Sequence, residues 1–95
     1  MLSKIDKFLD TEGRIKQLPR KGIIKQEVLT YLAQKFEFDI DYTEKEVNEI
    51  IKTWHTFNDY FLLRRELIDY QYICRTLDGS RYWKKPTFMK QTEVE

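Results

Sequence analysis

The stretch YTEKEVNEIIKTWHTFNDYFLLRRELIDY, residues 42–70, decides the fold because it encodes two consecutive helices joined by a short break. Thr43 and Glu46 form a capping box, in which the hydroxyl and the carboxylate each accept a backbone N–H at the start of the first helix. Asn58 is the expected cap of the second helix, which continues to about Tyr70. Two helices connected in this way predict a helix-turn-helix.

The apolar residues of both helices recur every three or four positions, as on the buried face of a helix. They are Val47, Ile50, Ile51 and Trp54 in the first helix and Tyr60, Leu63, Leu67 and Tyr70 in the second. Phe61 and Leu62 cannot both face the core that Leu63 faces. We therefore expect at least one of them to point toward solvent or toward a partner.

Another helix and a short strand are predicted upstream of this stretch. The helix begins at Lys21 or Gly22 and continues to about Lys35, with apolar residues again at helical spacing. Residues 38–42 alternate apolar and acidic side chains, which is the period-two pattern of a short edge strand.

A β-hairpin is predicted downstream. Residues 72–77 and 81–84 are its strands, and Asp78 with Gly79 favours a type I′ turn between them. The order helix, strand, helix, short turn, helix, hairpin is that of an α+β winged helix-turn-helix. Such a domain has a three-helix core and a small antiparallel hairpin as its wing.

The composition is that of one ordinary globular domain, with 41% hydrophobic and 35% charged residues in a chain of 95. We expect residues 1–20 to form an N-terminal extension, with a short helix near its start, that packs on the core. Residues 21–85 form the winged-helix domain, and residues 86–95 form a C-terminal tail without a strong pattern.

The cellular compartment is inferred by elimination. Cys74 is the only cysteine, so no internal disulfide forms and an oxidising compartment gains no support. The apolar run at 60–63 is far shorter than the roughly 20 residues of a membrane span. Charged residues interrupt the first nine positions, which argues against a signal peptide. We expect a cytoplasmic protein that does not contact a membrane.

The net charge of +1 hides an uneven distribution. Residues 14–25 contain five basic side chains and no acidic one, whereas residues 37–49 contain six acidic side chains against Lys45. The basic segment extends a basic surface if it lies beside the helix that begins near Asn58. Otherwise it offsets the acidic segment within the fold or across a dimer.

An enzyme is not indicated, because the residues that would form an active site are too few. His55 is the only histidine and Cys74 the only cysteine, so neither a Cys–His pair with a supporting group nor a metal cluster is suggested. We expect His55 to cap a helix or to be a hydrogen-bonded partner, and Cys74 to be a small buried apolar residue. No cofactor and no metal are predicted.

Four stretches, in this order, carry a resemblance to a known family. They are FLDTEGRIKQLPRK at 8–21, YTEKEVNEI at 42–50, LRRELIDY at 63–70 and DGSRYW at 78–83. The chain resembles a bacterial family of domains of unknown function that occur alone or appended to helix-turn-helix transcriptional regulators. The resemblance implies a winged-helix-like fold and a connection to transcriptional regulation, without an assigned activity or ligand. Gln71 departs from the family, which usually has a helix-ending glycine there.

The leading hypothesis is a non-catalytic winged-helix domain of transcription-regulator type that binds double-stranded DNA through the third helix and the wing. Its candidate contacts are basic side chains, namely Arg64, Arg65, Lys52, Arg81, Lys84 and Lys85. Trp83 lies among the basic residues of the wing, where a ring could stack on a base. We favour the core for Trp83, because large aromatic side chains anchor small cores.

A protein-interaction or dimerisation module is the alternative hypothesis. It has the same fold, binds no nucleic acid, and associates with itself or with a regulator domain through Phe61 and Leu62. Salt distinguishes the two hypotheses, because DNA binding through phosphates weakens steeply as salt rises and apolar association does not.

Overall fold

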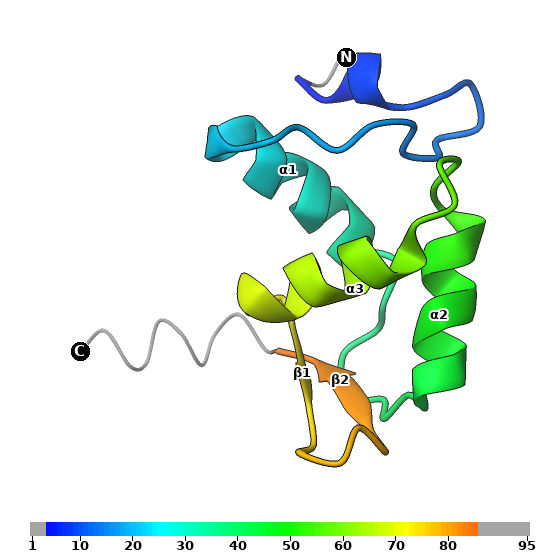
Figure 1. Ribbon diagram of the computed structural model, residues 1–95, viewed down its shortest axis with the longest axis vertical. Coiled ribbons are helices and arrows are strands. Elements are labelled where there is room, and N and C mark those ends of the chain that lie inside the picture. Colours follow the sequence, from blue (N-terminus) through cyan, green and yellow to red (C-terminus); the bar gives the residue numbers. More distant parts are fainter. Residues whose placement is uncertain (1–3, 86–95) are drawn as a thin grey trace.

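Three α-helices precede a two-stranded hairpin in the computed structural model, which describes residues 4–85 (Figure 1). The elements are the 3-10 turn η1 (Asp6–Phe8), the helices α1 (Gly22–Ala33), α2 (Glu44–Thr53) and α3 (Tyr60–Asp69), and the strands β1 (Ile73–Arg75) and β2 (Tyr82–Lys84). This order confirms the predicted α+β winged helix-turn-helix. Ser3, the cap that the sequence predicts for the short N-terminal helix, and the tail at 86–95 lie outside the described residues.

The capping box predicted at the start of α2 is present. The Thr43 hydroxyl accepts the Glu46 N–H at 3.1 Å, and the Glu46 carboxylate accepts the Thr43 N–H at 2.9 Å. The helix therefore begins where the sequence places it, and it presents Val47 and Ile51 to the core with no exposed surface.

The cap of α3 lies one residue later than predicted. The Asp59 carboxylate accepts the Leu62 N–H at 3.1 Å, so Asp59 is the N-cap and the expectation for Asn58 is wrong. Asn58 instead adopts a φ of 55°, a left-handed conformation that asparagine tolerates better than most residues. It closes the break between α2 and α3 and leaves the next residue at the cap position.

The core lies where α3 contacts α1, α2 and β1. Its buried apolar residues are Ile5, Ile15, Val28, Leu29, Leu32, Ala33, Phe36, Val47, Ile51, Leu63, Leu67, Ile73 and Tyr82. Ile15 bridges the extended segment before α1 to the end of α2, because its N–H donates to Trp54 O at 2.8 Å and its carbonyl accepts the Thr56 N–H at 2.9 Å. Tyr70, predicted to be buried, is 36% exposed.

The edge strand predicted at 38–42 is reduced to a single bridge. Only Tyr42 pairs, exchanging two backbone hydrogen bonds of 2.7 and 2.8 Å with Tyr82. Asp39 has a φ of 64°, which interrupts the extended conformation that a strand requires. The residues before Tyr42 therefore form a loop, on which Phe38 and Ile40 are partly exposed.

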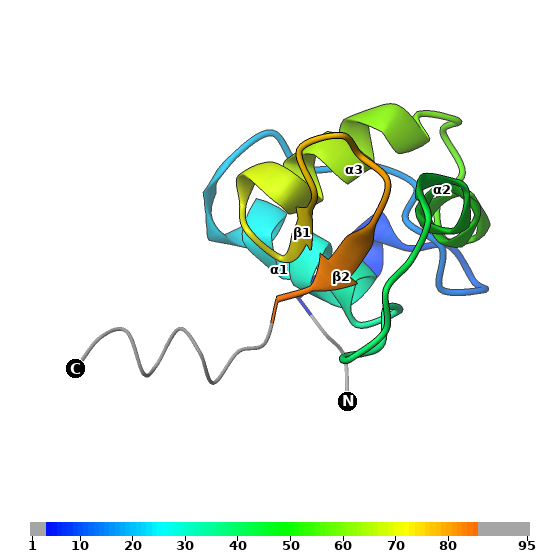
Figure 2. The same cartoon turned by 90° about the horizontal axis from the view of Figure 1, so that it is seen from below.

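The hairpin is antiparallel and pairs Cys74 with Trp83 and Arg75 with Tyr82. Its turn is not type I′, because that turn needs two positive φ angles and only Gly79, at 74°, has one. The Gly79 N–H donates to Thr76 O at 3.0 Å, which closes a four-residue turn over residues 76–79 within a longer loop. Figure 2 shows the hairpin lying across the ends of α1 and α3.

Candidate functional site

A groove of about 320 Å³ separates α3 from the hairpin. Its lining residues come from α3, from the start of α2 and from the hairpin, and they are Glu44, Phe61, Arg64, Arg65, Ile68, Asp69, Arg75 and Tyr82. Two of the predicted contact residues, Arg64 and Arg65, therefore lie together here. Phe61 is 58% exposed at one side of the groove, which confirms that one of the two neighbouring apolar residues of α3 points outward.

Arg64 is held by α2. Its Nη1 donates to Asn48 Oδ1 at 2.6 Å and lies 3.4 Å from Glu44 Oε2, and its side chain is only 13% exposed. The guanidinium also lies over the Phe61 ring, 5.1 Å from its centroid. Arg64 therefore fastens α3 to the start of α2, and most of its hydrogen-bonding surface is turned away from solvent.

Arg65 and Arg75 are the exposed arginines of the groove. Within residues 4–85, neither side chain makes a hydrogen bond or an ion pair. Sequence reasoning missed Arg75, because its place depends on the hairpin register, which sets it opposite Tyr82. The predicted strand at 72–77 included this residue but did not show which side of the strand meets α3.

The carboxylates of α3 are not equivalent. Glu66 pairs with Lys25 of α1 at 3.0 Å, and both side chains are about one-seventh exposed. The hydrogen bond from Lys25 to Glu66 raises the pKa of the Lys25 ammonium group, which favours its charged form. The C-terminal end of the basic segment 14–25 thus lies beside α3 and neutralises Glu66, whereas Asp69 is exposed at the groove.

The other predicted contact residues lie apart from this groove and are held by interactions within the fold. Arg81 pairs with Asp41 at 3.3 Å, and Lys52 lies over the Tyr60 ring. Lys85 Nζ donates to the side chain of Gln71 at 2.8 Å.

Lys84 is the most enclosed of these basic residues. Its Nζ donates to Phe36 O at 3.3 Å and lies 4.3 Å from the centroid of the Phe38 ring. Burial lowers the pKa of its ammonium group. Lys84 therefore fastens the hairpin to the loop that follows α1.

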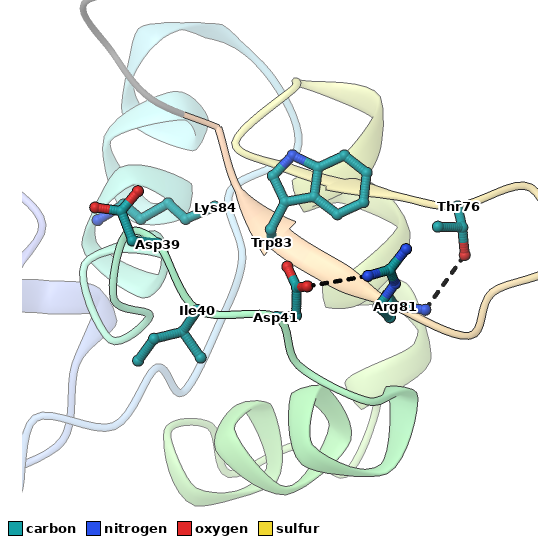
Figure 3. A pocket seen from close by; sticks show the side chains of 7 residues that line it. All are labelled: Asp39, Ile40, Asp41, Thr76, Arg81, Trp83 and Lys84. Atoms are coloured by element: carbon teal, nitrogen blue, oxygen red, sulfur yellow. Dashed lines mark hydrogen bonds and ion pairs between the residues drawn. The ribbon is translucent and has the colours of Figure 1, made fainter.

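Trp83 lies on the outer face of the hairpin, which corrects the expectation that it covers the core. Tyr82 is the buried ring of β2, 3% exposed, and its neighbour must point to the opposite side of the strand. Trp83 lines a second groove, of about 520 Å³, together with Asp41, Arg81 and Lys84 (Figure 3). Cys74, opposite Trp83 in the register, is half-buried and not part of the core, contrary to the prediction.

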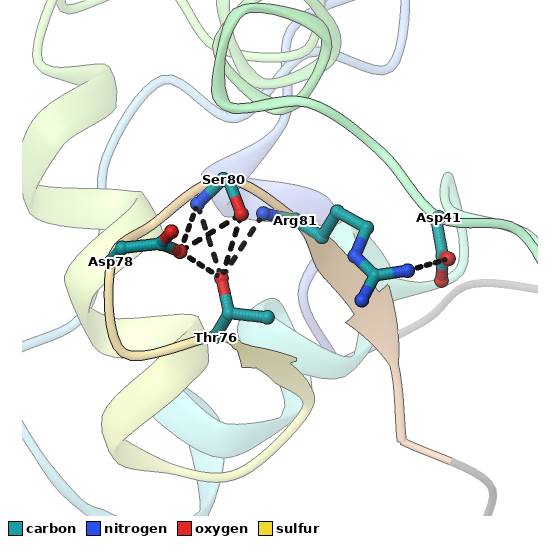
Figure 4. Close-up of polar contacts among 5 residues, drawn as sticks. All are labelled: Asp41, Thr76, Asp78, Ser80 and Arg81. Atoms are coloured by element: carbon teal, nitrogen blue, oxygen red, sulfur yellow. Dashed lines mark hydrogen bonds and ion pairs between the residues drawn. The ribbon is translucent and has the colours of Figure 1, made fainter.

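The hairpin loop is organised by one carboxylate (Figure 4). Asp78 Oδ1 accepts the Thr76 hydroxyl at 2.8 Å, the Ser80 N–H at 3.0 Å and the Ser80 hydroxyl at 2.8 Å. These hydrogen bonds, led by the one from Thr76, lower the pKa of Asp78 to about 2. The loop therefore has a fixed shape and a permanent negative charge beside the fully exposed Leu77.

His55 is a buried structural residue, which confirms the prediction of a hydrogen-bonded partner. Its Nδ1 lies 2.6 Å from Ile51 O, and its Nε2 accepts the Asp59 N–H at 2.8 Å. This pattern requires the proton on Nδ1, so the ring joins the end of α2 to the cap of α3.

No group of three or more His, Cys, Asp or Glu residues in the described part of the chain is placed to hold a metal ion. In the same part, no helix has the length and apolar content needed to cross a membrane.

Comparison with protein families gave one match. A family described as an uncharacterized protein conserved in bacteria, DUF2087, matches residues 14–84, which include all three helices and both strands. Neither the curated proteins nor the solved structures gave a match.

Proposed function

The chain belongs to the bacterial family DUF2087, and we propose that it is a non-catalytic winged-helix domain of transcription-regulator type that binds double-stranded DNA. In this proposal, α3 is the recognition helix and the hairpin is the wing. A cytoplasmic location is part of the proposal, because bacterial chromosomal DNA is found there.

The observation that carries the proposal is the position of Arg65 and Arg75 on the two sides of one groove, exposed and without an ion pair within the described residues. An unpaired guanidinium binds phosphate bidentately, and phosphate contacts supply most of the affinity in DNA binding that is independent of sequence. An arginine on the helix and another on the wing would meet the backbone at two points.

The fold also removes part of the acidic charge from this surface. Glu66 is paired with the Lys25 ammonium group, and the half-exposed Glu44 is paired with Arg64, so Asp69 is the carboxylate of the groove that has no ion pair within the described residues. We assign Arg65 and Arg75 as the principal contacts and Arg64 as a positioning residue. Arg81, Lys52, Lys84 and Lys85 are secondary phosphate contacts at the edges of the surface, because each first has to leave an internal partner.

Fluorescence anisotropy with a labelled duplex of mixed sequence tests the proposal. We expect saturable binding at low salt that weakens as salt rises, and weaker binding by Arg65→Ala and by Arg75→Ala. Each substitution should reduce the slope of log affinity against log salt by about one. Lys45→Ala, which removes an exposed lysine away from this groove, is the matched control. Absence of binding by the wild type at low salt would contradict the proposal.

The second candidate function, a self-association or regulator-binding module, is favoured by the 58% exposure of Phe61. An apolar ring at the rim of a groove is a common anchor in protein interfaces. Under this candidate, sedimentation shows association that rises with concentration, is insensitive to salt and is lost in Phe61→Ser. A wild-type chain that stays monomeric at every concentration would contradict the self-associating form.

A further inference from the structure

A groove on the flank of α2 that faces away from α3 combines an apolar floor with an acidic rim. It measures about 640 Å³, and among its lining residues are Ile40, Tyr42, Lys45, Glu46, Glu49 and Ile50. Glu44 and Asn48 lie on the other flank of α2, where they hold Arg64. The groove is therefore separate from the one between α3 and the hairpin, and the following inference does not rest on DNA binding.

We propose that this groove binds a basic peptide segment of another protein, with an apolar side chain placed between lysines or arginines. Ile40 is 38% exposed on the loop before α2. Tyr42 and Ile50, the latter in the second turn of α2, are half-buried and line the same groove. An apolar side chain of a partner would cover these residues and remove them from water.

Carboxylates lie on the rim of this groove. Glu49 has no side-chain partner within the described residues, and the Glu46 carboxylate accepts the Thr43 N–H. Asp41, which also lines the groove of Trp83, is paired with Arg81, so the rim charge comes from Glu46 and Glu49, with Lys45 as the basic residue of the lining. A cationic partner matches this charge, and a partner with an acidic surface is repelled.

The same charge argues against a second copy of this chain as the occupant. In a two-fold symmetric dimer, each groove would face its own copy and bring the two sets of carboxylates together. In the basic segment of a second copy, Ile15 is fully buried and Lys25 is held by Glu66. Only Ile23, which is 72% exposed beside Lys21, could enter the groove, in a head-to-tail contact between copies that sedimentation detects.

The test uses the full-length chain and a short fluorescein-labelled peptide in which leucine and lysine alternate. Binding should be saturable in the wild type. It should weaken about tenfold or more in Ile40→Ser, because that change removes one buried apolar contact. Glu49→Lys should also weaken binding, through the reversal of one rim charge. Both positions are on the surface, and circular dichroism verifies that the variants remain folded.

Asp69→Lys is the matched control, because it makes the same charge reversal in the other groove. It should leave peptide affinity unchanged at physiological salt, where charges more than about 8 Å apart are largely screened. A peptide with serine in place of leucine should bind weakly, and one with glutamate in place of lysine should not bind.

Three results would overturn the proposal. The first is absence of saturable binding by the wild type, and the second is an equal loss in Glu49→Lys and Asp69→Lys, which would indicate non-specific attraction. The third is a wild-type dimer in sedimentation that Ile40→Ser dissociates, because the groove would then belong to a second copy.

Discussion

The arginines of the groove between α3 and the hairpin differ in whether they have a partner within the fold. Arg64 is adjacent to Arg65, yet it is fastened to Asn48 and Glu44 whereas Arg65 is exposed to solvent. A guanidinium group that is paired within the fold must break its internal contacts before it binds phosphate. Exposure to solvent and the absence of an internal partner therefore identify candidate phosphate contacts better than positive charge alone does. Arg75 becomes a candidate by this criterion although sequence reasoning did not include it.

Asp78 provides a pH-dependent prediction at the scale of one residue. Its pKa of about 2 lies below the usual value of 3.8, so its ionised form stabilises the folded state. This stability is fully present above about pH 4 and is lost as the pH falls through about 2. The urea midpoint of Asp78→Asn should therefore lie below that of the wild type at neutral pH, and the difference should shrink as the solution is acidified. A difference that does not change with pH would contradict this assignment.

Gln71 provides a second prediction, at the junction between α3 and β1. Its φ of 65° is left-handed, which costs a residue with a Cβ about 1–2 kcal/mol, whereas glycine adopts it freely. The greater freedom of glycine in the unfolded chain offsets part of the gain, so Gln71→Gly should stabilise the domain by about 0.5–1 kcal/mol. Chemical denaturation of both proteins measures this. Destabilisation by Gln71→Gly would mean that the side-chain contact of Gln71 with Lys85 outweighs the backbone strain.

At the scale of elements, the features that could be predicted from the sequence are local ones. The capping box of Thr43 and Glu46 depends on residues three positions apart, and the helices follow from apolar spacing. The errors concern positions set by distant contacts. The alternation of side chains along a strand does not show whether Tyr82 or Trp83 faces the core. Tyr82, which does, is also the residue that forms the backbone bridge with Tyr42, forty residues away.

The candidate site could be predicted only in part, for the same reason. Arg64 and Arg65 follow from their place on the third helix, but the ion pair that holds Arg64 requires α2 and α3 to be packed. Arg75 depends on the hairpin register, and the acidic groove depends on a loop that the sequence pattern described as a strand. Packing thus decides which side chains of a correctly predicted element are accessible.

At the scale of the whole molecule, the two flanks of α2 differ in character. On one flank, α2 braces α3 through Arg64 beside the exposed Arg65 and Arg75. On the other flank, carboxylates surround an apolar groove. The domain we propose binds DNA on the first flank and a basic partner on the second. Such a domain could connect a partner protein to DNA without the two sites overlapping.

The most direct test of DNA binding by α3 and the hairpin is the salt dependence of duplex binding by the wild type and by the double variant Arg65→Ala, Arg75→Ala. We expect the wild type to bind at low salt and the double variant to bind more weakly, with a slope of log affinity against log salt reduced by about two. Equal affinities and equal slopes for the two proteins, or no binding by the wild type, would contradict the claim that α3 and the hairpin form a DNA-binding surface.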